Sequence, residues 1–343
     1  MTSPSSIRLG TRRSRLATAQ AGMVARDLER VSGRPVELVE IVSEGDTSRA
    51  SLASLGGTGV FATRLREALL VGECDLLVHS LKDLPVAQPP GLVIAATPVR
   101  ADARDVVITR DGAPLGEMPA GARIGTGSPR RIAQVRRANP GVRTHDLRGN
   151  IDSRMGRVRS GELDAVVLAA AGLGRVDASD EGASTLGDLR AEPRDLGSWP
   201  TAAGQAALAV ETRADADPEL AAWIARLDDP LTRFAVDIER AVLGGIEAGC
   251  HAPVGAHARV EDDELRAQAV VYGDGETTIV AERRERIPDL RDLVEGYIVR
   301  RGSGAAVDGT GLAARASEIG LDLARRLLDD GAADIVRREA PTT

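Results

Sequence analysis

With 343 residues, 43% of them hydrophobic and 28% charged, the chain has the composition of a globular protein and the length for two or three domains. Its formal net charge of −7, with no separate basic block, argues against nonspecific binding to nucleic acid. The longest apolar run, residues 165–173, is too short to span a bilayer, and the first residues hold no apolar signal core. We therefore expect a soluble cytoplasmic protein.

Strands and helices alternate through the first two thirds of the chain. The predicted strands are residues 7–10, 36–42, 75–79, 105–109, 123–125, 143–147 and 164–169. The predicted helices between them are residues 15–32, 61–71, 129–138 and 151–160. Such alternation is typical of βα units on a mostly parallel sheet, and because it starts afresh after residue 104 we expect two α/β domains.

A third, smaller α+β domain is predicted after residue 228, where this pattern ends. Its predicted elements are a helix at 231–244, strands at 256–260, 265–272 and 277–283, and a helix at 314–330. Residues 288–311 fit least well and are interpreted as an insertion. The expected domains are residues 1–100 with 202–224, residues 104–199, and residues 228–340, with the chain crossing between the first two near 99–104 and 199–205.

Lysine and cysteine are rare enough to single out. Lys82 is the only lysine, which favours a position that requires a compact ammonium, although chance retention is the alternative. Cys74 and Cys250 lie far apart without metal-ligand spacing, so we expect neither a metal site nor a disulfide. Cys74 begins a predicted buried strand and is interpreted as a small hydrophobic residue. Cys250 lies in an irregular loop, where a thiol is accessible, and pairing with His251 is disfavoured because adjacent side chains point apart.

The Lys82-Asp83 pair directly follows the predicted strand 75–79. One interpretation is an exposed ion pair that contributes less than about 1 kcal/mol. The other is an acid fixed in a cleft, where it manages protons or stabilises a developing cation. Position alone leaves both interpretations open.

Arginines recur where predicted strands end, and α/β proteins place their ligands there. Arg12 follows the first strand. In residues 125–131, a strand and a tight turn lead to Ser128 as helix N-cap, with Arg130 and Arg131 in the first helical turn. Cations oppose the helix dipole at this end, and an anionic ligand would resolve that conflict.

The same arrangement recurs at two more strand ends. Arg148 precedes a predicted cap at Asn150, with Arg154 one turn further, and Arg175 follows a predicted turn at 171–174. Taken alone, each arginine is interpreted as a solvated surface residue. Taken together, these arginines predict a pocket for several carboxylates or phosphates. The chain lacks the phosphate-binding GxxxxGK[ST] loop and a GxGxxG motif after a strand.

Six short motifs stand in order along residues 7–260. They are Arg12-x-Ser14-x-Leu16-Ala17, Gly56-Gly57-x-Gly59-x-Phe61, Val78-His79-Ser80-Leu81-Lys82-Asp83-Leu84-Pro85, Gly125-Thr126-x-Ser128-Pro129-Arg130-Arg131, Leu147-Arg148-Gly149-Asn150 and Gly249-Cys250-x-x-Pro253-x-Gly255. Residues 169–175 and Gly204-Gln205 match the same set. Together they resemble the hydroxymethylbilane synthase (porphobilinogen deaminase) family.

This resemblance implies two periplasmic-binding-protein-like α/β domains around a cleft and a third domain whose Cys250 carries one covalent dipyrromethane cofactor through a thioether. Four porphobilinogen molecules would be added in turn, each losing ammonia, before water releases the linear tetrapyrrole. The implied enzyme is a monomeric cytoplasmic transferase of heme biosynthesis that uses no metal, nucleic acid or membrane.

The resemblance also assigns roles to individual residues. Asp83 and Lys82 would be catalytic, and we expect the carboxylate that stabilises the cation to be buried. The residues implied to hold the cofactor are Cys250, Asp83, Lys82, Ser128, Arg130, Arg131, Arg148 and Gly149. Those implied to bind substrate are Arg12, Ser14, Phe61, Arg148, Arg154, Arg175 and Gln205.

Several positions depart from the family pattern. Thr58 replaces a common lysine and Gly127 a common serine, which puts anion contacts in doubt more than the reaction type. The main alternative is a non-enzymatic anion-binding or solute-binding module, which explains the arginines but gives Cys250 no role. A phosphate-handling transferase is the third candidate.

Overall fold

The computed structural model describes residues 6–42, 59–179, 184–248, 252–275, 277–302 and 311–338. Its first sheet has five strands in the order β2-β1-β3-β10-β4. These are β1 (Ile7–Thr11), β2 (Val36–Glu40), β3 (Leu76–Ser80), β4 (Leu92–Ala96) and β10 (Leu208–Arg213). The second sheet has five strands in the order β7-β6-β8-β5-β9. These are β5 (Asp105–Thr109), β6 (Arg123–Gly125), β7 (Arg143–His145), β8 (Ala165–Ala169) and β9 (Arg190–Pro193).

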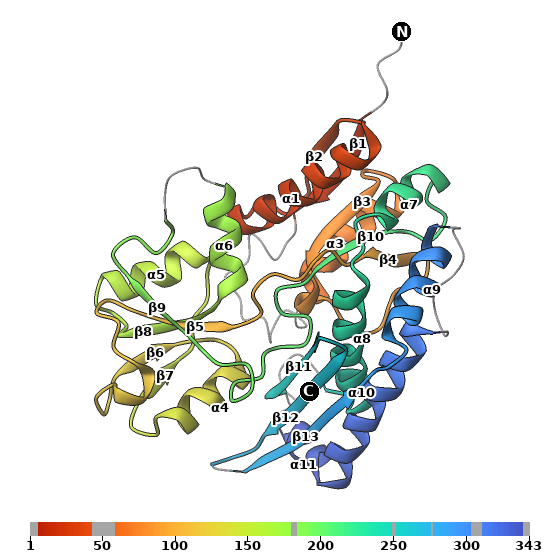
Figure 1. The fold of residues 1–343 in the computed structure, drawn as a ribbon. Coiled ribbons are helices and arrows are strands. Elements are labelled where there is room, and N and C mark those ends of the chain that lie inside the picture. The colour runs from red at the N-terminus through yellow and green to blue at the C-terminus, as the bar shows by residue number, and fades with distance from the viewer. Residues whose placement is uncertain are drawn as a thin grey trace.

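Each five-stranded sheet belongs to one of two lobes, which Figure 1 shows side by side. The chain passes from the first lobe to the second through residues 97–104 and returns through residues 194–207. We call these segments the first and second crossing. The expected α/β class, with two such lobes and a smaller third unit, is confirmed.

As expected for mostly parallel sheets, four strands of each sheet run in the same direction, and one strand opposes them. β10 runs antiparallel to both of its neighbours, and so does β5. Both strands follow a crossing, and each begins opposite the last residue of a neighbouring strand, Leu208 opposite Ser80 and Asp105 opposite Ala169. Because the chain enters each sheet at the edge where the parallel strands end, it has to run the other way.

Helices cover the two sheets, and three of them begin at a side-chain cap. They are α1 (Arg15–Ser32), α3 (Gly59–Leu70), α4 (Pro129–Ala138), α5 (Ile151–Arg159), α6 (Ala170–Ser179) and α7 (Pro218–Ala225), with short 3-10 turns η1 (Leu81–Asp83) and η2 (Leu115–Glu117). Ser14, Ser128 and Asn150 each accept a hydrogen bond from a backbone N–H of the helix that follows. The turn predicted at residues 171–174 is instead part of α6.

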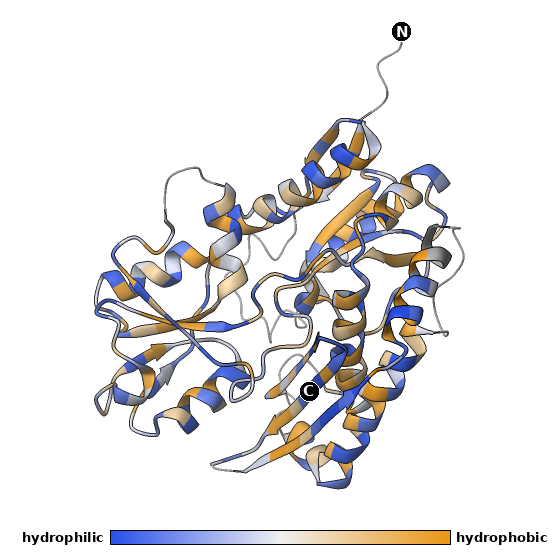
Figure 2. Ribbon diagram, viewed as in Figure 1, coloured by the Kyte–Doolittle hydropathy of each residue, from blue (hydrophilic) through white to orange (hydrophobic). Residues whose placement is uncertain are grey.

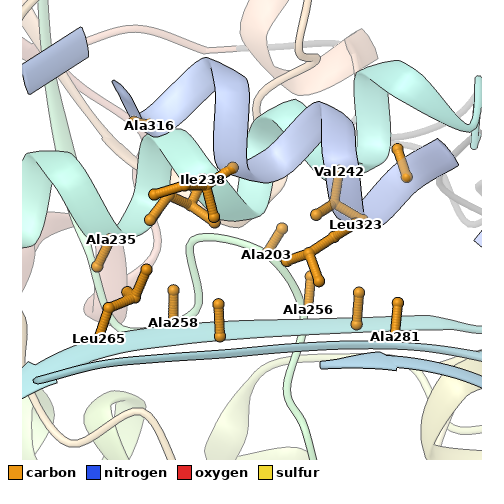
Figure 3. Packing of buried hydrophobic residues seen from close by; sticks show 14 of the residues in the cluster. Ala203, Ala235, Ile238, Val242, Ala256, Ala258, Leu265, Ala281, Ala316 and Leu323 are labelled. Carbon is orange, nitrogen blue, oxygen red and sulfur yellow. The ribbon is translucent and has the colours of Figure 1, made fainter. Parts of the chain in front are cut away.

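The third unit packs two long helices on a three-stranded antiparallel sheet. Its elements are α8 (Pro230–Gly245), β11 (Val254–Glu261), β12 (Glu264–Tyr272), β13 (Thr278–Arg286), α9 (Leu290–Gly302), α10 (Leu312–Asp329) and α11 (Ala332–Arg338). Figure 3 shows small side chains between the helices and the sheet, among them Ala203 of the second crossing. Because Ala203 belongs to this core, the third unit is packed directly on the connection between the lobes.

Residues 288–311, expected to be an insertion, are packed on the third unit over their described part. They contain α9, in which Tyr297 is 6% exposed and donates a hydrogen bond to Asp228. Leu290 at the start of α9 is also buried in the third core. Apolar residues lie mainly on the inner faces of helices and strands throughout the fold (Figure 2).

Candidate active site

Two adjoining cavities form the cleft between the lobes. The first has a volume of about 890 Å³ including its open mouth, and the second about 1630 Å³. Four residues line both cavities: Lys82, Asp83, Arg131 and Arg154. They come from η1, α4 and α5, so the cleft joins groups that lie far apart in the sequence.

Lys82 and Asp83 are held at the end of β3 by their buried neighbour Leu81, which is 1% exposed. The Lys82 ammonium donates a hydrogen bond to Gln205 Oε1 at 3.3 Å. Burial, together with the charge of Arg131, lowers the pKa of Lys82 to about 8. A fraction of these ammonium groups is therefore neutral near physiological pH.

Asp83 is exposed in the cleft, so the expectation of a buried carboxylate is wrong. The short 3-10 turn directs Leu81 into the core and leaves the following acid facing solvent. Among the residues that the structure describes, none donates a hydrogen bond to its carboxylate, which leaves both oxygens accessible to a ligand.

Arg130 and Arg131 are almost fully buried at the N-terminus of α4. Both bind Asp105, through Arg130 Nη1 at 2.8 Å and Arg131 Nη2 at 2.6 Å. The conflict between these cations and the helix dipole is thus met by an internal carboxylate rather than only by a ligand. Sequence reasoning missed Asp105, because a lone acid at the start of a strand carries no signal of such partners.

Two guanidinium nitrogens in the cleft walls are buried and unpaired among the described residues. They are the Nε atoms of Arg130 and Arg175. Arg175, on α6, donates from Nη2 to the Ala206 carbonyl, and burial lowers its pKa to about 10. Because a buried N–H without an acceptor is costly, these atoms fit a ligand that carries carboxylates.

Arg148, Gly149 and Arg154 lie together where the loop after β7 enters α5. Arg154 donates from Nε to the Gly149 carbonyl at 2.8 Å, and burial lowers its pKa, with a further contribution from Arg131. Gly149 has a φ of 106°, a conformation that favours glycine. Arg148 is exposed and its Nε lies 3.5 Å from Asp146.

Of the remaining predicted site residues, some line a cavity and others do not. Ser14 caps α1 and lines the first cavity, and Gln205 is fully buried and lines the second. Arg12 is half-buried after β1 and is not among the residues that line either cavity. The side chain of Phe61 lies outside the described part of the chain.

Cys250 also lies outside the described residues, which stop at Ala248 and resume at Ala252. Both alanines line the second cavity, together with Asp83 and Arg148. The described residues on either side of Cys250 therefore line the same cleft as the acid and the arginines.

One contact across the cleft was not predicted. Arg15 at the start of α1 donates from Nη1 to Asp152 of α5 at 3.2 Å, and both line the first cavity.

No helix in the described ranges is long and apolar enough to cross a membrane. The same ranges contain no cluster of three or more His, Cys, Asp or Glu residues suited to a metal.

Fold and site together define a two-lobed α/β protein with an arginine-lined cleft that is suited to an anionic ligand beside an exposed acid. The model of the porphobilinogen deaminase dipyrromethane cofactor binding domain matches residues 7–221, and that of the C-terminal domain matches residues 233–295. The chain belongs to the porphobilinogen deaminase family.

Curated relatives agree over most of their length. Porphobilinogen deaminase 1 of Streptomyces coelicolor is 52% identical over 299 residues, 83% of this chain and 90% of the relative. The porphobilinogen deaminase of Mycobacterium tuberculosis is 45% identical over 330 residues, 96% of this chain and 98% of the relative. Among solved structures, a periplasmic binding protein of Salmonella typhimurium is similar at 12% identity and a TM-score of 0.36, over 65% of this chain and 93% of that chain.

Proposed function

We propose that the chain is a hydroxymethylbilane synthase, a transferase that joins four porphobilinogen molecules and releases one ammonia with each. Water then releases the linear tetrapyrrole hydroxymethylbilane. The observation that carries the proposal is the pair of unpaired, buried guanidinium nitrogens of Arg130 and Arg175 around an exposed Asp83. Every pyrrole unit brings two carboxylates into this cleft, and each guanidinium offers them a two-pronged donor.

The dipyrromethane cofactor fits this cleft, and we assign its thioether to Cys250. The family model that matches residues 7–221 describes a domain that binds this group. The other thiol is a poor candidate, because Cys74 is 0% exposed and burial raises its pKa to about 11. When bound, the cofactor supplies the pyrrole carbon to which the first unit is joined.

The residues proposed to hold the cofactor surround the second cavity. They are Lys82, Asp83, Ser128, Arg130, Arg131, Arg148 and Gly149, of which all but Gly149 line it. Gly149 lines the first cavity and places its carbonyl on Arg154. The proposed substrate residues are Arg12, Ser14, Phe61, Arg148, Arg154, Arg175 and Gln205.

Asp83 is the proposed acid–base group. Its accessible carboxylate is positioned to handle the proton of the departing amine and to stabilise the positive charge that develops on the substrate as ammonia leaves. The protonated Lys82 beside it would bind a carboxylate rather than transfer a proton. No catalytic nucleophile is required, because the electron-rich pyrrole ring of the substrate supplies one.

We further infer three domains, residues 1–100 with 202–224, residues 104–199, and residues 228–340. Support comes from the three sheets, each of which has its own strands.

We also propose that the protein is a monomer in the cytoplasm and acts without nucleic acid or membrane. The net charge of −7 supports the exclusion of nucleic acid.

The proposal is tested by the intact mass of the purified protein and of two cysteine variants. We expect an added mass of two linked pyrrole units on the parent and on Cys74→Ala, and none on Cys250→Ala, which should be inactive. Cys74→Ala should lose about 1–2 kcal/mol of stability from packing alone. An adduct on the peptide with Cys74, or an active Cys250→Ala protein, would falsify the assignment.

A further inference from the structure

Asp105 is a buried carboxylate behind the cleft with four hydrogen-bonding partners. It is the first residue of β5 and is 0% exposed. Its Oδ2 accepts from Arg130 Nη1 at 2.8 Å and from Trp199 Nε1 at 3.0 Å. Its Oδ1 accepts from Arg131 Nη2 at 2.6 Å and from Gln205 Nε2 at 2.8 Å. Although burial opposes ionisation, the charges of Arg130 and Arg131 hold the pKa of Asp105 well below its usual range.

Asp105 lines neither cavity, but the groups that it binds do. Arg130 and Arg131 both line the second cavity, and Gln205 carries the contact onward to the Lys82 ammonium. One carboxylate thus lies behind three cations that face the ligand space. Without it, these cations would be buried together with no counter-charge in contact, an arrangement with a large desolvation penalty.

We propose that Asp105 is a positioning residue, which fixes the guanidinium groups of Arg130 and Arg131 and, through Gln205, the ammonium of Lys82. This inference rests on the proposed function, since it concerns how the cleft receives pyrrole carboxylates. The arrangement leaves Arg130 Nε unpaired while another nitrogen of the same guanidinium is bound to Asp105. The guanidinium of Arg130, which lines the second cavity, is therefore held in place before the ligand arrives.

The inference also predicts a change in pH dependence. The charged groups around Lys82 are Arg131 and Arg130, which lower its pKa, and Asp83 and Asp105, which raise it. Removing the charge of Asp105 lowers the pKa of Lys82 further. If protonated Lys82 is needed, the alkaline limb of the rate profile moves to lower pH, which a change in packing alone would not cause.

The test is Asp105→Asn, with Asp164→Asn as the matched control. Asp164 accepts from Arg123 Nη2 at 3.0 Å in the same lobe but lines neither cavity of the cleft. We expect Asp105→Asn to fold, to lower turnover about 10²-fold through misplaced donors, and to shift the alkaline limb to lower pH. Asp164→Asn should keep the parent turnover and pH profile.

A second variant, Asp105→Glu, separates charge from position. It keeps the negative charge but displaces it by one methylene, so turnover should fall while the alkaline limb stays where it is. Parent-like turnover in Asp105→Glu, or an unshifted limb in a folded Asp105→Asn, overturns the inference. If neither variant folds while Asp164→Asn does, Asp105 serves folding alone and the inference also fails. Intact mass is measured first, because a parent without the pyrrole adduct refutes the proposed function instead.

Discussion

Replacing Gly204 by alanine tests how closely the second crossing packs on the 3-10 turn η1, which carries Lys82 and Asp83. Gly204 has a φ of 73°, and a Cβ atom there would lie 2.9 Å from Leu81 Cγ. Alanine in the left-handed region costs about 1–2 kcal/mol, and overpacking a filled site adds about 1–3 kcal/mol. We therefore expect Gly204→Ala to lower the free energy of unfolding by about 2–5 kcal/mol.

The control is Gly33→Ala, which shares the conformation but not the crowding. Gly33 ends α1 with a φ of 68°, and no atom of a non-neighbouring described residue lies within 4 Å of a Cβ placed there. Its cost should be the conformational part alone, about 1–2 kcal/mol. Calorimetry should show a Tm lower for Gly204→Ala than for Gly33→Ala by at least about 2 °C.

Activity provides the second measurement for the same pair. Leu81 directly precedes Lys82 and Asp83, so a displaced Leu81 moves the acid, and a shift of about 1 Å can cost about 10²-fold in rate. Gly33→Ala should retain full activity, because Gly33 lines neither cavity of the cleft. Equal melting temperatures and full activity in Gly204→Ala would refute the reasoning.

Three further predictions concern the cleft. Asp83→Asn should fold normally but lose about 10²–10⁴ in turnover, and near-normal turnover in steady-state assays would end the acid–base assignment. Arg148→Lys keeps the charge but loses the two-pronged donor, so stalled intermediates should appear in mass spectra, and parent-like kinetics at all substrate concentrations would contradict this role. The pKa of Lys82 is about 8, so its ammonium form predominates below that pH. If this ammonium binds a substrate carboxylate, the rate should fall as pH rises through about 8. Lys82→Arg should lose that alkaline limb, and a parent rate that stays flat up to about pH 10 would exclude the requirement.

Local signals in the sequence predicted the parts of the fold that depend on neighbouring residues. Ser128 and Asn150 cap α4 and α5 as expected, because a cap requires only a side-chain oxygen two or three residues before a free N–H. The family resemblance also assigned Lys82, Asp83 and Arg154 to one site, and all three line the same cavities.

Features that depend on distant contacts were missed. The glycines at 172 and 174 suggested a turn, but Gly172 lies in α6, where a Cβ would be 3.1 Å from Ile151 Cδ1. Its small size serves close packing, which periodicity does not reveal. Asp105 was missed for the same reason, because its partners lie 25 to 100 residues away in the chain.

The two crossings also determine how the lobes can move. Two lobes joined by a single connection can rotate freely about it. Two separate connections restrict the lobes to bending about the line through both attachment points. Opening of the cleft about this line would keep the arginine-bearing lobe aligned over Asp83. Because Ala203 of the second crossing is embedded in the third core, this bending is mechanically coupled to the unit whose chain continues to Cys250. In a reaction repeated on a lengthening product, such a hinge would return the two lobes to the same alignment for every addition.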